Sequence, residues 1–347
     1  MTELVLAVDG GGAKTDLALL RPNGEVLSLV RGGGSSPHHV GVDGCIALLE
    51  QLRLQAFHRA GLDPAVPRRV LTGQFLIAGA DLPEELETLR ARIALMDWSE
   101  RLVVENDTLA LLRAGSDRGW GIAVVCGAGA NCIGIAPDGR QARFLALGAI
   151  TGDWGGGGDV GLAALGAAAR SADGRGPRTV LESVVPRHFG MREPRDVSRA
   201  LHLRELPSAR LGELAPVAFA AAASDPVAAG LVDRLADEVV AFASAALRRL
   251  ELTDEDPDVV LGGSLLRRAP DFALRRIEHG IRALCPQAGV ILAPSAPIVG
   301  AALLALDDLD AAASATGRAR AQLDEAVADL EAAGMDGPAR LVRSAHG

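Results

Sequence analysis

Residues 4–30 read LVLAVDGGGAKTDLALLRPNGEVLSLV, and this stretch decides the fold. The apolar run at 4–9 predicts a short buried strand, the glycines after it predict a tight turn, and 17–20 predicts a second strand. Asn23-Gly24 indicates a hairpin, because this dipeptide tolerates the positive φ of a type I′ turn, and a third strand is expected at 26–30. We therefore expect a three-stranded antiparallel meander.

The same pattern returns at 122–147, which reads IAVVCGAGANCIGIAPDGRQARFLAL. An apolar run at 122–126 leads into a glycine turn, a second strand is expected at 132–136, and Pro137-Asp138-Gly139 precedes a strand expected at 143–147. The repeat interval of about 115 residues is too long for a solenoid and indicates two duplicated α/β lobes. We expect the boundary between residues 115 and 121.

The remaining segments alternate between helical and strand patterns. Downstream of the second meander we expect a glycine-rich loop at 152–161 and mostly helix from 162 to 252. From residue 311 onward, apolar residues at helical spacing predict a solvated or partner-facing helix. Further helices are expected at 43–60, 83–96 and 108–114, and further strands at 70–78, 102–105, 259–261 and 290–292.

Composition restricts the class of function. The 347 residues are 49% hydrophobic and 23% charged, as in an ordinary soluble globular protein. A formal net charge of -9 argues against a nucleic-acid or anionic-membrane partner, because both need a basic surface. No leader pattern and no long apolar window is present, so we expect a cytoplasmic protein. Four cysteines without C-x-x-C or zinc spacing are expected to be reduced thiols.

The two glycine turns are the first candidate site. A glycine turn between strands lets several backbone N–H groups approach phosphate oxygens, although a single such turn equally well closes a hairpin. In the first turn, Lys14 lies close by and Asp9 could hold Mg²⁺ through water. A Walker A loop is excluded because no glycine immediately precedes Lys14, and the G-x-G-x-x-G match at 156–161 does not follow the first strand of a βαβ unit.

Three further positions leave alternatives open. Asp107 stands where a strand ends and a helix begins, so it is either a helix N-cap or a catalytic base at a strand end. Trp154 either stacks on a sugar ring or belongs to the core. His38-His39 could suggest a metal pair, but adjacent histidines point apart, and we expect no metal there.

Taken together, the motifs resemble those of the BadF/BadG/BcrA/BcrD ATPase family, in particular its N-acetylglucosamine kinases. The similarity covers roughly residues 4–305 in order. The motifs that carry it are Asp9-Gly10-Gly11-Gly12-Ala13-Lys14-Thr15-Asp16, Gly79-Ala80-Asp81, Glu105-Asn106-Asp107, Gly127-Ala128-Gly129-Ala130-Asn131 and Gly152-Asp153.

The resemblance implies two ribonuclease H-like (actin-like ATPase) lobes with a central cleft. We expect an N-terminal lobe at 1–117 completed by a helix at about 298–314, a C-terminal lobe at 118–297 and a helical tail at 315–347. It also implies an ATP-dependent carbohydrate kinase that uses Mg²⁺ and a small sugar, most simply converting N-acetylglucosamine to its 6-phosphate. Glucosamine or another hexose stays open as substrate, and so does a homodimer.

By similarity, Asp107 would be the general base and Asp9 the metal-binding residue. ATP phosphates would lie against Gly10, Gly11, Gly12, Lys14, Thr15, Gly127, Ala128, Gly129 and Asn131. Gly262, Gly263 and Ser264 would face the adenosine. The sugar would contact Ser36, Gly79, Asp81, Asn106, Asp153 and Trp154.

The chain also departs from the family pattern. Ala13 stands where the family usually has Thr, Ser36 replaces an Asn of the sugar pocket, and Trp154 replaces a Glu after the Gly-Asp pair. These differences put the identity of the sugar in question more than the phosphoryl transfer.

Two rival functions follow from the same motifs. One is an activator ATPase with an iron–sulfur cluster, although Cys126 and Cys132 do not resemble its ligand setting. The other is a sensor that binds sugar or nucleotide without turnover. Kinases of the repressor-related glucokinase family are a further alternative, but their Glu-x-Gly-His motif and zinc cysteines are not found in the sequence.

Overall fold

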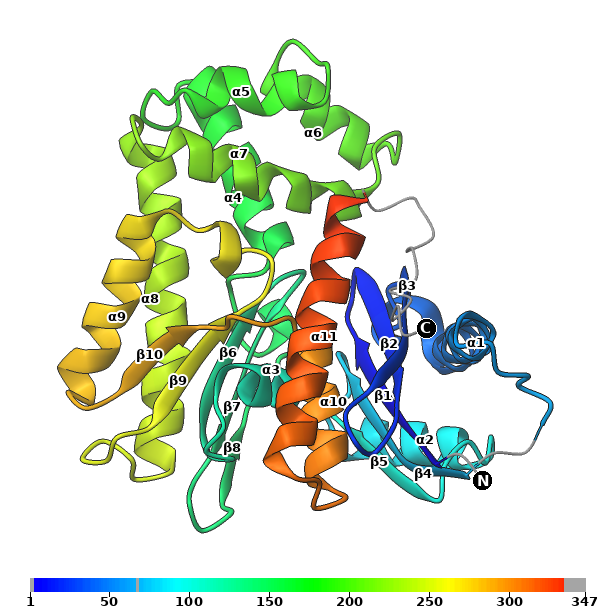
Figure 1. Cartoon of the computed structure of the whole chain (residues 1–347). Coiled ribbons are helices and arrows are strands. Elements are labelled where there is room, and N and C mark those ends of the chain that lie inside the picture. The colour runs from blue at the N-terminus through cyan, green and yellow to red at the C-terminus, as the bar shows by residue number, and fades with distance from the viewer. Residues whose placement is uncertain (1–2, 67–68, 334–347) are drawn as a thin grey trace. The chain divides into compact units, whose positions relative to one another are not determined.

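The computed structural model describes residues 3–66 and 69–333. Its chain forms two compact units (Figure 1). The first contains the described residues up to Gly119 and those from Ala293 onward, and the second is Trp120–Leu292. The part of the expected helical tail beyond residue 333 lies outside the described residues.

A five-stranded sheet in the order β3-β2-β1-β4-β5 forms the centre of the first unit. The first three strands are the predicted antiparallel meander, and β4 and β5 continue the sheet parallel to β1. Crossovers between the parallel strands are helical, as parallel pairing requires. The strands are β1 (Glu3–Gly10), β2 (Lys14–Leu20), β3 (Val26–Gly33), β4 (Arg69–Ile77) and β5 (Arg101–Glu105).

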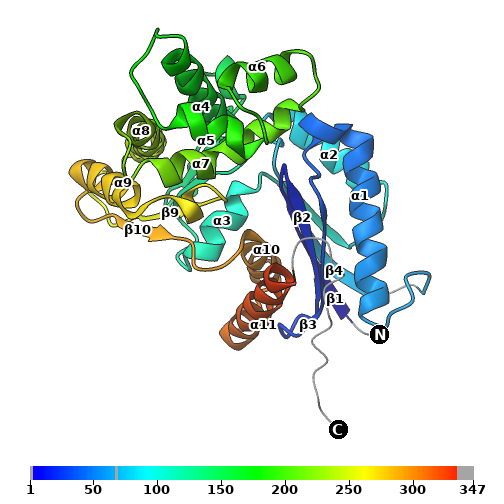
Figure 2. The same ribbon diagram turned by 90° about the horizontal axis from the view of Figure 1, so that it is seen from above.

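Both faces of this sheet are buried, because successive residues of a strand point to opposite sides. Leu4, Leu6 and Val8 of β1 pack against α1 (Pro37–Arg59) and α2 (Pro83–Ala94). Val5 and Ala7 face the other side, in a cluster with the C-terminal helices α10 (Pro297–Asp307) and α11 (Ala313–Ala332). Figure 2 shows the two helical layers on either side of the strands. The short helix α3 (Thr108–Gly115) follows β5 and packs on α10.

The second unit repeats this sheet. Read from its other edge, the second sheet has the order β8-β7-β6-β9-β10. Each strand then corresponds to one strand of the first sheet, with the same parallel and antiparallel pairs. The prediction of two duplicated α/β lobes is therefore confirmed. The strands are β6 (Gly121–Cys126), β7 (Ala130–Ile135), β8 (Gln141–Arg143), β9 (Asp258–Gly262) and β10 (Gly289–Leu292).

Helices make up most of the second unit outside its sheet. The longest, α8 (Pro226–Arg249), buries one apolar face that includes Leu235, Val239 and Ala246. Among the described residues no single helix is long and apolar enough to cross a membrane, and only a pair bent by 113° would meet that test jointly. The helices are α4 (Gly157–Ala172), α5 (Leu181–His188), α6 (Pro194–His202), α7 (Leu214–Ala221), α8 (Pro226–Arg249) and α9 (Asp271–Leu284), with short 3₁₀ turns η1 (Gly148–Ile150), η2 (Ser208–Glu213) and η3 (Leu266–Arg268).

The hairpin turns differ from the predicted type. A type I′ turn needs positive φ at both central residues, but only Gly24 has it in the first hairpin, at 82°. Its N–H donates to the Arg21 carbonyl at 2.9 Å, and Gly139 (φ 85°) does the same with Ala136. The type I′ prediction for Asn23-Gly24 is therefore wrong, because the turn begins one residue earlier and Pro22 holds its first central position at negative φ.

Other boundaries also moved. The strand expected at 143–147 is β8 at Gln141–Arg143, and the predicted loop at 152–161 ends at Gly156, since α4 begins at Gly157. The helix expected from residue 43 begins at Pro37, with a break at Gly41. The apolar stripe of α11 does not face solvent or a partner. Its Leu323 and Val327 are buried against the first sheet.

Candidate active site

The first glycine turn joins β1 to β2 and is held by backbone contacts. Gly11 N–H donates to the Lys14 carbonyl at 2.9 Å, and the Gly11 carbonyl accepts from Ser35 N–H at 3.0 Å. A Cβ at Gly10 would lie 2.6 Å from Ser35 Oγ, and one at Gly34 would lie 2.2 Å from the Gly12 carbonyl. The Gly34 contact is with backbone, so only glycine fits there, and the chain at Gly34 packs closely on the turn.

Asp9 ends β1 beside this turn, with only 7% of its surface exposed. Burial raises the pKa of Asp9 well above its usual range, and the nearby Asp16 and Asp107 carboxylates raise it further. Two buried hydroxyls without a hydrogen-bond partner among the described residues, Thr15 Oγ1 and Ser35 Oγ, lie near Gly10 on the other face of the strand pair from Asp9. The buried Asp9 carboxylate is an oxygen ligand of the kind that a hydrated hard cation prefers.

Asp16 faces Asp9 across the β1–β2 pair and was not among the predicted site residues. It is fully buried and accepts two hydrogen bonds from Arg31, at 2.6 and 2.8 Å. Lys14 Nζ lies 3.4 Å from the same carboxylate. Asp16 therefore orients the cation of Lys14, and the register of the predicted hairpin was the signal that could have identified it.

Asp107 lies between the end of β5 and the start of α3. Its side chain makes no capping bond. Asn106 caps the helix in its place, because its Oδ1 accepts from Thr108 N–H at 3.0 Å and Thr108 Oγ1 at 2.6 Å. The Asn106 amide also donates to Asp81 at 2.7 Å. Asp107 thus stands at the N-cap position of α3 without making a side-chain capping bond.

Burial, and then the charge of Asp81, raise the pKa of Asp107 to about 7, against partial opposition from the N–H groups of Asp107 and Thr108. A general base is most effective when its pKa lies near the working pH. The electrostatic surroundings of Asp107 therefore match those of a catalytic carboxylate.

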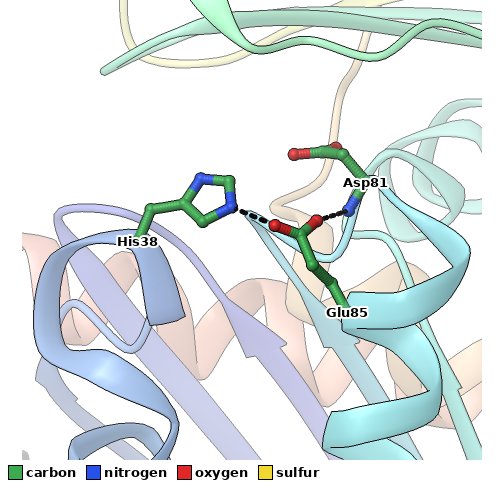
Figure 3. Close-up of side chains that lie close together, drawn as sticks. All are labelled: His38, Asp81 and Glu85. Atoms are coloured by element: carbon green, nitrogen blue, oxygen red, sulfur yellow. Dashed lines mark hydrogen bonds and ion pairs between the residues drawn. The ribbon is translucent and has the colours of Figure 1, made fainter.

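A second polar group lies at the start of α2 (Figure 3). Glu85 accepts from the backbone N–H groups of Asp81 and Leu82 at 3.0 and 2.9 Å, and its other oxygen lies 2.7 Å from His38 Nε2. Burial alone would raise the pKa of Glu85, but the hydrogen bonds from His38 and the two N–H groups outweigh it and lower the pKa. Ligand atoms of His38, Asp81 and Glu85 all lie within 4.8 Å of one another.

Within the second unit, three predicted segments come together. Gly127 N–H donates to the Gly129 carbonyl, and the Gly127 carbonyl accepts from Gly157 N–H, both at 2.8 Å. Gly263, with φ 93°, would bring a Cβ within 2.1 Å of the Cys126 carbonyl. The turn at 127–131, the start of α4 and the segment 262–264 therefore form one glycine-lined surface.

The other predicted site residues of the second unit, Asn131, Asp153 and Trp154, each have a side-chain contact within that unit. The Asn131 side chain accepts from Cys132 N–H at 2.7 Å, and Thr151 Oγ1 donates to Asp153. Trp154 packs against the core, with the Arg234 guanidinium 4.1 Å from its ring centroid. One ring face of Trp154 is thus already covered by a cation.

The four cysteines are free and buried. Burial raises the pKa of the Cys126 thiol to about 12, and it raises the pKa of Cys132 further. Neither thiol is activated as a nucleophile or a ready metal ligand.

Two α/β units with one strand order, each with a glycine turn after its first strand, place this chain in the actin-like class of ATP-binding folds. The chain belongs to the BadF/BadG/BcrA/BcrD ATPase family, whose family model matches residues 6–305. The family resemblance read from the motifs is therefore confirmed.

Similar proteins are known from several organisms. The N-acetylmuramic acid/N-acetylglucosamine kinase of Clostridium acetobutylicum is 24% identical over 88% of this chain and 99% of its own length. The N-acetyl-D-glucosamine kinase of Dictyostelium discoideum is 24% identical over 88% of this chain and 98% of its own. A Chromobacterium violaceum crystal structure, proposed to be an N-acetylglucosamine kinase, superimposes with a TM-score of 0.70 at 24% identity, over 87% of this chain and 98% of its own.

Proposed function

We propose that this protein is an ATP-dependent kinase that phosphorylates a hydroxyl of an amino sugar, most simply the 6-hydroxyl of N-acetylglucosamine. Membership of an ATPase family and similarity to kinases named for N-acetylglucosamine support this proposal. The observation that carries it is Asp107, a carboxylate with a pKa of about 7. The side chain of its neighbour Asn106, rather than that of Asp107, accepts the capping hydrogen bond from Thr108 N–H.

Asp107 acts as the general base in this proposal. It accepts the proton of the sugar hydroxyl while that oxygen attacks the γ-phosphorus of ATP, and ADP leaves with the electrons of the broken P–O bond. With a pKa of about 7, part of the Asp107 carboxyl is ionised near neutral pH and can accept a proton. The raised pKa also means that Asp107 holds an accepted proton more firmly than an ordinary carboxylate would.

Two backbone turns serve the phosphates of ATP. In the first unit the residues are Gly10, Gly11, Gly12, Lys14 and Thr15, with Asp16 orienting the Lys14 ammonium. In the second unit Gly127, Ala128, Gly129 and Asn131 offer the equivalent turn, and Gly262, Gly263 and Ser264 face the adenosine. Glycine lets the backbone N–H groups approach the phosphate oxygens closely, and each N–H donated to an anion strengthens binding.

Asp9 would hold Mg²⁺ through water. The buried carboxylate at the end of β1 fits this hard cation, which prefers oxygen ligands and keeps several waters. When bound, Mg²⁺ supplies positive charge that neutralises the phosphate oxygens of ATP.

The sugar is bound by Ser36, Gly79, Asp81, Asn106, Asp153 and Trp154 in this proposal. Asn106 and Asp81 are joined by a hydrogen bond, so they would meet the sugar as one polar unit. The Ser36 side chain is shorter than the Asn that the family usually has at this position. We therefore infer more space between residue 36 and the sugar. A cytoplasmic location and a homodimer complete the proposal.

The direct test is a panel of amino sugars and hexoses incubated with the purified protein and Mg-ATP, read by product mass. We expect N-acetylglucosamine or glucosamine to gain one phosphoryl group, with one ADP formed per product. ATP hydrolysis that no sugar stimulates would instead indicate an activator ATPase. Sugar binding without any product would indicate a sensor, and either result would overturn the proposal.

A further inference from the structure

His38, Asp81 and Glu85 form a mixed nitrogen and oxygen group, of which the kinase proposal uses only Asp81, as a sugar contact, and gives His38 and Glu85 no role. They come from three separate segments, the start of α1, the loop after β4 and the first turn of α2 (Figure 3). One ligand atom from each lies within 4.8 Å of the others. Adjacent ligands on one metal ion with bonds of about 2.1 Å lie roughly 3 Å apart, so the 2.7 Å between His38 and Glu85 is close to chelating distance.

The backbone around this group is fixed in position. Two N–H groups hold one oxygen of Glu85, which leaves the other directed at His38. Asn106 holds one oxygen of Asp81. Gly79, at φ 78°, lets the loop approach α1, because a Cβ there would lie 2.6 Å from Ser36 Oγ and 3.2 Å from His38 Nδ1. Hydrogen bonds behind the ligands are the usual way in which proteins orient a metal site.

The charge of the group also favours a cation. Two carboxylates face one imidazole, and the charge of Asp81 is felt as far as Asp107. A divalent ion could be bound by both carboxylates, while His38 gives its Nε2 proton to solvent and becomes a neutral ligand.

We propose that His38, Asp81 and Glu85 bind one first-row transition-metal dication, with Zn²⁺ as its best representative, at a site separate from Mg²⁺ at Asp9. The imidazole nitrogen selects this ion class, because Mg²⁺ and Ca²⁺ take oxygen ligands while Zn²⁺ accepts histidine and carboxylate together. Solvent water supplies the remaining coordination position. This site would tie the loop after β4 to both flanking helices, and it goes beyond the proposed kinase function.

Calorimetric titration of the chelator-treated full chain with Zn²⁺, in buffer that contains Mg²⁺, tests the proposal. Two ligand variants, His38→Asn and Glu85→Gln, are compared with two matched variants of exposed neighbours on the same helices, His39→Asn and Glu84→Gln. Gln can keep the capping role of Glu85, so α2 should stay folded. We expect one Zn²⁺ per chain in the wild type and both neighbour variants, and an affinity at least about tenfold lower in both ligand variants.

Melting temperatures measured with and without Zn²⁺ separate metal binding from damage to the fold. Zn²⁺ should raise the melting temperature of the wild type and of His39→Asn but not of His38→Asn. Co²⁺ in place of Zn²⁺ should give a visible absorption band that is lost in Glu85→Gln. Absence of stoichiometric Zn²⁺ binding by the wild type, or equal binding by the ligand and neighbour variants, would overturn the proposal.

Discussion

The two units share one strand order, yet they differ in the side chains at the ends of their strands. In the first unit Asp9 precedes the glycine turn, whereas Cys126 precedes the turn of the second. After β5 the chain continues Asn106-Asp107, whereas Ala293-Pro294 follows β10. Duplication has therefore kept the backbone turn in both units but the carboxylates in only one. In the proposed function, the difference means that each unit offers a glycine turn to phosphate, whereas the carboxylates assigned to proton transfer and cation binding belong to the first unit.

Replacing Asp107 by Asn should have the largest effect. A positioned base contributes about 10² to 10⁴ in rate, so we expect kcat to fall by that factor, which corresponds to about 3 to 5 kcal/mol. Binding of ATP should change little, because Asp107 is not among the phosphate-binding residues. Sugar-dependent ADP release measures the first effect, and nucleotide titration the second. Near-normal turnover in Asp107→Asn would remove the catalytic role from the first unit.

Asp9→Asn should separate activity from stability. The folded-state pKa of Asp9 is raised, so its contribution to stability is present at low pH and is lost as pH rises through that pKa. At neutral pH the uncharged Asn should therefore raise the melting temperature by a few degrees, for a gain on the order of 1 kcal/mol. Turnover should fall by about 10² or more, because the proposed Mg²⁺ ligand is gone.

Cys126→Ala is the matched variant for Asp9→Asn, since it changes the equivalent strand end of the second unit. It should lower the melting temperature slightly and leave turnover within a few-fold of the wild type. Thermal melts and steady-state kinetics of both variants make the comparison. If Asp9→Asn were both active and less stable than the wild type, the assignment of the buried carboxylate to a cation would fail.

Gly263→Ala tests the glycine-lined surface of the second unit. The new Cβ would clash with the Cys126 carbonyl at a φ of 93°, so we expect a loss of about 3 kcal/mol in the free energy of unfolding and a higher KM for ATP. Gly139→Ala has a similar φ but no atom within 4 Å, and should cost about 1 kcal/mol with no change in KM. Denaturant unfolding and ATP titration would show whether the clash or the φ value decides the effect.

The smallest effect concerns pH. Because the base must be ionised, kcat/KM for the sugar should rise with pH through a midpoint of about 7. Asp81→Asn removes a negative charge that raises the pKa of Asp107, so the midpoint should move toward lower pH. A pH profile identical in both proteins would show that Asp81 does not act on the base.

Much of the architecture could be predicted from local patterns. The strands of both meanders follow from apolar runs and turn residues, and the repeat of the pattern gave the duplication. Gly157–Gly158 was assigned to a loop because glycine is a poor helix former, yet α4 begins there, with Asp159 accepting from Gly155 and Gly156 N–H. The capping bonds of Asp159 therefore outweigh the low helix propensity of these glycines.

The predicted site lacked residues whose contacts span long sequence distances. Asp107 and Asp9 stand at strand ends and were identified from the motifs. The pairing of Arg31 with Asp16 depends on strand register, and the contact of His38 with Glu85 joins segments 47 residues apart. A single sequence carries no signal for such a contact, because neither residue needs its partner for its own helix.

The alternation of side chains along β1 has a consequence for synthesis of the protein. Val5 and Ala7 leave the ribosome before the residues that cover them on α10 and α11, which lie nearly 300 positions later in the chain. During that interval one face of the first sheet has no native cover and is open to non-native association. The intervening segment, Trp120–Leu292, can complete its own sheet earlier. We therefore expect the second unit to finish folding before the first, although the strands of the first unit are translated earlier.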